Sequence, residues 1–154
     1  MPKKEFSEDL QRLFLEILVS NSGLFVRVQN IYNAKNFSRS LREIAEFIWA
    51  YSDKYKSLPT IEQVNSVFGS NLKIPTLSEI HNDWFLDEFE NFNRRQELER
   101  AILKAADLIE EGDFDPVEKL IKDATQIGLV RDIGMDYFLE PRKRLMSIKE
   151  NNGQ

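Results

Sequence analysis

The chain of 154 residues contains no cysteine, a single histidine and only six glycines and five prolines. Without cysteine it can form neither disulfides nor thiolate metal sites. No apolar run is long enough to span a bilayer, and no apolar signal segment follows Met1, so we expect a cytoplasmic protein without a membrane contact. No internal repeat or low-complexity tract is present.

Composition sets the size of the core and limits the choice of partner. Apolar residues make up 42% of the chain and aromatic residues 11%, which is enough for one respectable core. The net charge is −5 and the isoelectric point is near 5.1. This acidic balance argues against a surface built chiefly to hold nucleic-acid phosphates, and no direct nucleic-acid binding is expected.

One stretch, from Asp83 to Glu111, dominates the pattern of the chain. Its apolar residues recur every three or four positions, which is the spacing of one helix face. They are Phe85, Phe89, Phe92, Leu98, Ile102, Ala105, Ala106 and Ile109. A helix of this length measures roughly 40 Å, which is longer than a domain of this size is wide. We therefore expect one end to project and to need a partner.

A second, shorter helix is predicted to return along the first. Gly112 ends the long helix, Asp115 can cap the next one, and Pro116 suits a first helical position. The pair forms an αα-hairpin over residues 83–126. We predict that the hairpin self-associates through its apolar side chains. The residues concerned are Phe85, Phe89, Phe92, Leu98, Ile102, Ile109 and Leu120.

The region before the hairpin, residues 1–82, is predicted to be a globular helical domain. Ser7 caps a first helix, Ser38 or Ser40 starts a core helix that reaches Tyr55, and Thr60 with Gln63 forms a capping box. Residues 24–32 do not alternate cleanly as a strand should, so we expect a short helix there. The predicted fold class is all-α: a small helical bundle, a protruding hairpin and a short linker helix.

The last region, residues 127–154, reads as a linker that contains this final helix. The helix would run from Arg142 to Glu150, and about ten residues are too few to persist alone in water. We predict that it docks on another surface through an apolar edge beside cations. These docking residues are Leu145, Met146, Ile148, Arg142 and Arg144. The turn sequence that follows normally leads into more protein, so we expect either a fragment or a tail that binds a partner.

Other site types find little support in the sequence. Residues 40–69 have the order of a DNA-reading helix-turn-helix, but the second helix carries Glu62 and no lysine or arginine. His81, the sole histidine, lacks the Glu-x-x-His spacing of di-iron sites. There is no phosphate-binding loop and no usable Ser/His/Asp set. We expect neither a cofactor, nor a metal site, nor catalysis in this chain.

Four stretches together resemble the N-terminal region of phage replicative DNA helicases of the DnaB type, in the branch found in T-even-like phages. They are LFVRVQNIYNAKNF, LREIAEFIWAYSDKYKSLPTIEQV, DWFLDEFENFNRRQELERAILKAADLIEEGDFDPVEKLIKDA and IGLVRDIGMDYFLEPRKRL. The similarity covers nearly the whole chain, and the last stretch is its most specific part.

The resemblance implies a role in assembly. In such helicases a helical N-terminal domain ending in a hairpin is joined by a linker helix to an ATPase motor. The hairpins pair as dimers within a ring, usually of six, whose collar faces the primase or the helicase loader, and the linker helix packs on a neighbouring subunit. The ATP- and magnesium-binding motor and the DNA-gripping loops are missing from this sequence. Helicase activity is therefore implied only for a parent protein, in the cytoplasm of an infected bacterium.

Overall fold

The computed structural model describes residues 6–128, which form helices and connecting turns without any strand in that range. The prediction of an all-α chain is confirmed. Six α-helices and two short 3-10 helices follow one another in this order: α1 (Glu8–Ser20), α2 (Ser22–Val28), η1 (Ala34–Asn36), α3 (Arg39–Tyr55), α4 (Ile61–Phe68), η2 (Glu79–His81), α5 (Asn82–Glu110) and α6 (Asp115–Thr125). The predicted docking residues Arg142, Arg144, Leu145, Met146 and Ile148 lie outside the described residues.

Local capping chemistry fixes several helix ends. The Ser7 hydroxyl accepts a hydrogen bond from the Leu10 N–H at 3.1 Å and so begins α1. At the start of α4 the Gln63 N–H donates to Thr60 Oγ1 at 3.0 Å, and the Thr60 N–H donates to Gln63 Oε1 at 2.8 Å. This reciprocal pair is the predicted capping box. Gly69, with φ of 65°, then ends α4 in the left-handed region.

The segment that could have been strand or helix is helical over its first half. α2 begins at Ser22, where the Asn21 side chain accepts from the Leu24 N–H at 3.1 Å. Leu24, Phe25 and Val28 are buried, and their spacing places them on the same side of a helix. The expected short helix is therefore present, although it ends at Val28.

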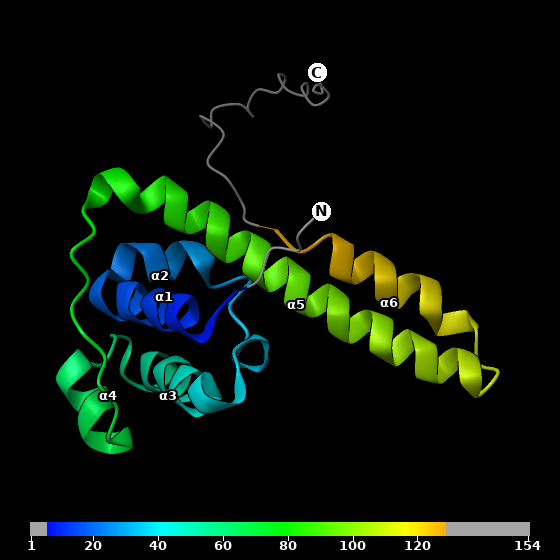
Figure 1. The fold of residues 1–154 in the computed structure, drawn as a ribbon, viewed down its shortest axis with the longest axis horizontal. Helices are drawn as coiled ribbons and strands as arrows, with labels where there is room; N and C mark the ends of the chain where they lie inside the picture. The colour runs from blue at the N-terminus through cyan, green and yellow to red at the C-terminus, as the bar shows by residue number, and fades with distance from the viewer. Residues whose placement is uncertain (1–5, 129–154) are drawn as a thin grey trace.

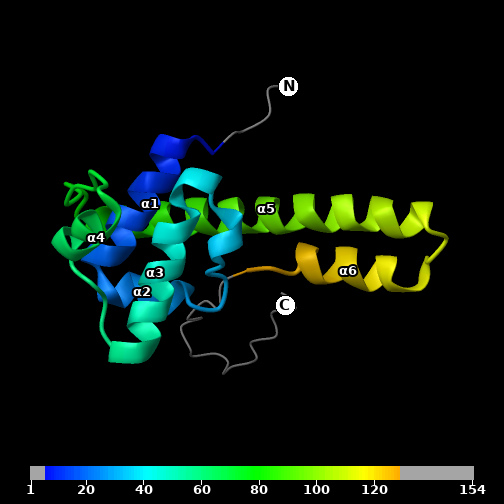
Figure 2. The same ribbon diagram turned by 90° about the horizontal axis from the view of Figure 1, so that it is seen from below.

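Figures 1 and 2 show a bundle of α1 to α4 packed along one end of α5, while the other end of α5 projects away from it. α5 has 29 residues, so it is about 44 Å long. α6 lies beside the projecting end and runs in the opposite direction in both views. We call the projecting part, residues 98–125, the arm.

The turn at the end of the arm differs in one detail from the expectation. Gly112 adopts φ of 84° and ends α5, as predicted. However, Asp115 is the first residue of α6 and not its cap, because Phe114 occupies the capping position without a side-chain hydrogen bond. Pro116 lies in the first turn, where its missing N–H costs nothing.

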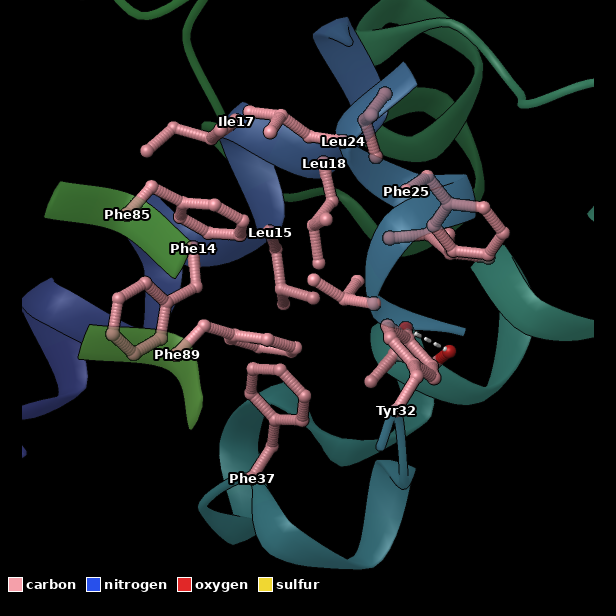
Figure 3. Packing of buried hydrophobic residues seen from close by; sticks show 14 of the residues in the cluster. Phe14, Leu15, Ile17, Leu18, Leu24, Phe25, Tyr32, Phe37, Phe85 and Phe89 are labelled. Carbon is pink, nitrogen blue, oxygen red and sulfur yellow. Dashed lines mark hydrogen bonds between the residues drawn. The ribbon is translucent and has the colours of Figure 1, made fainter. Parts of the chain in front are cut away.

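The core contains aromatic rings from α1, α2, the segment around η1 and α5 (Figure 3). Phe14 of α1 contacts Phe85 and Phe89 of α5, with ring centroids 5.8 and 5.4 Å apart. Phe37, which follows η1, contacts Phe92 at 5.2 Å. The first half of α5 therefore belongs to the bundle, and the predicted boundary between residues 82 and 83 divides the core instead of separating two domains.

Candidate self-association surface

Three of the residues predicted for self-association belong to the core. Phe85, Phe89 and Phe92 are fully buried, and each packs its ring against Phe14. Their burial within one chain corrects the prediction, because side chains already covered by α1 cannot contact a second copy. The spacing predicts the helix correctly, but the same spacing is found in a core helix and in an exposed stripe.

The two helices of the arm meet through small side chains. Ala101 and Ala105 of α5 and Ala124 of α6 are buried, although they lie beyond the bundle. Alanine side chains allow two helix backbones to approach closely. Larger apolar residues nearby are consequently left at the edges of this contact or outside it.

The remaining predicted residues lie on the arm and form a partly open apolar surface. Ile102 and Ile109 are each 52% exposed, and Leu98 and Leu120 are half-buried. Leu98, Ile102 and Ile109 are separated by four and seven positions, so they lie along one side of α5. We call these three residues the α5 stripe. Exposed branched side chains in a row along a projecting helix are typical of a contact with another protein surface.

Two exposed apolar residues of the arm were missed by the sequence reasoning. Leu103 is 68% exposed and Phe114 is 63% exposed. Leu103 follows Ile102 directly, so it points about 100° away from the α5 stripe. Phe114 lies in the turn between α5 and α6, where no helical period applies. A large aromatic ring in a turn otherwise made of glycine and acids was the signal that could have identified it.

A buried polar cluster fastens the arm where it leaves the bundle. The Asn36 amide donates to Asn93 Oδ1 at 2.6 Å, and both residues have no solvent exposure. Arg100 Nη1 donates to Asn36 Oδ1 at 2.6 Å and its Nη2 pairs with Glu97 Oε1 at 2.8 Å. The Asn33 amide also donates to Glu97, at 2.9 Å. Buried amides are costly unless they are satisfied, so these bonds hold α5 in one position against the η1 segment.

A second fastening holds the chain after α6. Arg94 Nε donates to the Ile127 carbonyl at 2.9 Å, and the Asn30 amide donates to the Gly128 carbonyl at 2.9 Å. A side chain at Gly128 would meet Glu90 Oε2 at 3.0 Å. The glycine therefore allows the backbone to pass close to α5. Both ends of the arm are tied to the bundle, one through the length of α5 and the other through residues 127–128.

The described residues offer no evident reaction centre. Within residues 6–128 no group of three or more His, Cys, Asp or Glu side chains could hold a metal ion, and no helix is long and apolar enough to cross a bilayer. The most perturbed titratable group is Tyr32, whose pKa is raised by burial. Its hydroxyl donates to the Ala45 carbonyl at 2.6 Å, so it has a structural partner between α2 and α3.

The helix-turn-helix alternative gains nothing from the geometry. α4 carries Glu62 as its one charged residue. Val64 is fully buried and Ile61 packs against the core, as expected for two helices that simply pack together. Val67, near the end of the same helix, is exposed. The second helix of this pair presents no cation with which to hold a phosphate or a guanine edge.

The arm, its α5 stripe and its two fastenings thus form the most distinctive surface of the described chain. No known protein family, no curated protein and no solved structure matches the sequence or the fold.

Proposed function

We propose that this chain is an assembly and protein-interaction module whose arm pairs with the arm of a second copy. The observation that carries the proposal is the α5 stripe, Leu98, Ile102 and Ile109, exposed or half-exposed on a helix that leaves the bundle. A lone two-helix arm buries only one side of each helix, and a matching arm would cover the other apolar side. Contacts between copies of one chain commonly follow two-fold symmetry, which puts the same stripe on both sides.

The fastenings support this proposal. The polar cluster around Asn36 and Asn93 fixes the direction of α5 as it leaves the core. A pre-oriented arm loses little conformational freedom when it binds, which improves affinity without additional contacts.

The resemblance in the sequence gives the biological setting of the proposal. We assign the module to the N-terminal collar of a ring-forming replicative helicase in phage DNA replication, acting in the cytoplasm of the bacterial host. Its dimers would build a hexameric ring, its outer face would meet the primase or the helicase loader, and the segment 142–150 would dock on a neighbouring subunit. ATP, magnesium and the helicase reaction belong to the parent protein.

Light scattering tests the proposal over a wide range of protein concentration. We expect the mass of the chain to rise from one copy to two, and that of a motor-bearing parent to reach six copies. Burial of the stripe supplies about 25 cal/mol for each Å² of apolar surface removed from water. A mass of one copy at every concentration, for the chain and the parent alike, would refute the assembly role.

A further inference from the structure

The free end of the arm, residues 107–118, combines exposed apolar side chains with charge of one sign. Ile109 and Phe114 are both more than half exposed. The end has no lysine or arginine, but it has six exposed carboxylates, and none of them makes an ion pair within the part of the chain that the structure describes. They are Asp107, Glu110, Glu111, Asp113, Asp115 and Glu118.

Two of these carboxylates lie where a helix disfavours them. Glu110 is the last residue of α5 and Glu111 is its cap, and no basic residue lies in the last turn. The carbonyl end of a helix carries a partial negative charge, so acidic side chains there are unfavourable and basic ones are preferred. Asp107 and Glu111 repel each other as well, since they are four residues apart. Acidic residues at a helix C-terminus and a pair of like charges are both locally unfavourable. Their combination at an exposed apolar end indicates a cationic, partly apolar partner.

We propose that residues 142–149 of the same chain bind to this end of the arm. This segment, RKRLMSIK, carries both cations and apolar side chains, which complement the acidic and apolar end of the arm. Its cations, Arg142, Lys143, Arg144 and Lys149, oppose the six carboxylates. Its apolar side chains, Leu145, Met146 and Ile148, can cover Phe114 and Ile109.

The length of the chain permits this contact. Thirteen residues, 129–141, separate Gly128 from Arg142. Fully extended, they span at most about 45 Å. The distance to be covered is roughly the length of α6, whose 11 residues measure about 16 Å. A tether of this kind gives an effective concentration on the order of mM, so the segment of the same chain occupies the site before that of another copy.

The contact gives the segment a binding surface in the unassembled chain. Its apolar edge would otherwise be open to water until a neighbouring subunit covered it. Docking on a neighbour then requires release from the arm, so the two contacts compete. This intramolecular contact does not require pairing of the arms, although it covers Ile109, which belongs to the α5 stripe as well.

Paramagnetic broadening in the full chain tests the contact, and the absence of native cysteine makes the labelling specific. A nitroxide is attached through Ser147→Cys, and amide signals are compared before and after reduction of the label. We expect residues 107–118 to lose most of their intensity, while residues 82–86 at the opposite end of α5 keep theirs. Raising the salt to about 1 M, where the Debye length is about 3 Å, should weaken the effect.

Two variants and one mixed sample complete the test. Arg142→Glu with Arg144→Glu should abolish the broadening, whereas the control Arg27→Glu with Arg39→Glu, two exposed cations of the bundle, should leave it unchanged. A mixture of isotope-labelled chain without nitroxide and unlabelled chain with nitroxide, kept dilute enough for light scattering to show one copy, should show none. Absent broadening, broadening spread over the bundle, or broadening confined to the mixture would each overturn the proposal. Light scattering of the same samples reports pairing of the arms separately.

Discussion

Individual buried polar residues determine where the arm points. Asn93 lies in the middle of α5, accepts from Asn36 at 2.6 Å and donates to the Phe89 carbonyl at 2.7 Å. An amide inside a helix among phenylalanines is a poor choice for packing alone. Asn93 is tolerated there because its amide oxygen and its amide nitrogen both have hydrogen-bond partners. The same bonds select one register between α5 and η1.

Replacing Asn93 by alanine should destabilise the chain by about 1–3 kcal/mol, because the Asn36 amide then loses its short acceptor inside the core. Urea unfolding followed by circular dichroism measures the change. Asn91→Ala is the matched control, since Asn91 is exposed on the same helix and should shift stability by less than about 0.5 kcal/mol. Equal effects of the two substitutions would show that the cluster does not contribute.

Tyr32 predicts how stability depends on alkaline pH. Burial raises the pKa of its hydroxyl in the folded chain above the ordinary value of 10.0. Above that pH the unfolded chain loses the proton and the folded chain keeps it. The stabilisation that comes from the Tyr32 hydroxyl is therefore fully present below about pH 10. Above that pH the free energy of unfolding falls by up to about 1.4 kcal/mol per pH unit.

Tyr32→Phe isolates this effect. The variant loses the hydrogen bond to the Ala45 carbonyl, so it should be less stable by about 1 kcal/mol near neutral pH. Its stability should then fall less steeply than that of the wild type between about pH 10 and pH 11. A free energy of unfolding that falls equally steeply with pH in both proteins across that interval would contradict the assignment of this effect to Tyr32.

At the scale of elements, the arm depends on how closely α5 and α6 approach. Ala105→Leu should push the helices apart and cost about 1–3 kcal/mol, because a buried alanine is replaced by a much larger side chain. Ala106→Leu provides the control, since Ala106 is exposed one position along the same helix. Hydrogen exchange of the α6 amides should accelerate in the first variant and not in the second. Unchanged exchange in both would mean that the alanines do not set the contact.

The helices themselves could be predicted from local chemistry, whereas their surroundings could not. Ser7, the Thr60–Gln63 box and Gly112 act within a few residues of themselves, so the sequence contains the whole cause of each helix end. Which side chains of α5 are buried depends on residues that are distant in the sequence. Phe89 and Ile102 share one helical period, yet Phe89 meets Phe14 in the core and Ile102 remains open. Periodicity identifies an apolar side but does not reveal what covers it.

The candidate site shows the same division between local and distant causes. Leu98, Ile102 and Ile109 could be selected from spacing, but the three phenylalanines selected with them belong to the bundle. The polar cluster could not be found at all, because Asn36 and Asn93 are 57 residues apart and each resembles an ordinary surface residue in the sequence. Only the fold brings them together.

For the whole molecule, the shape and the charge both favour a protein partner over a nucleic acid. The chain has a net charge of −5, and the free end of its arm is acidic. We expect a fluorescence titration with duplex DNA to show no binding at moderate salt. Affinity that falls steeply as salt is raised would instead reveal real phosphate contacts and would support the helix-turn-helix alternative.

The most direct test of pairing through the arm is sedimentation equilibrium of two single variants that differ only in the side of α5 they alter. Ile102→Asp places a charge on the α5 stripe, and Leu103→Asp places the same charge on a more exposed position about 100° away. We predict that Leu103→Asp keeps the mass of the wild-type dimer and that Ile102→Asp sediments as one copy with an unchanged circular dichroism spectrum. A dimer that survives Ile102→Asp, or that is lost equally in both variants, would contradict pairing through the α5 stripe.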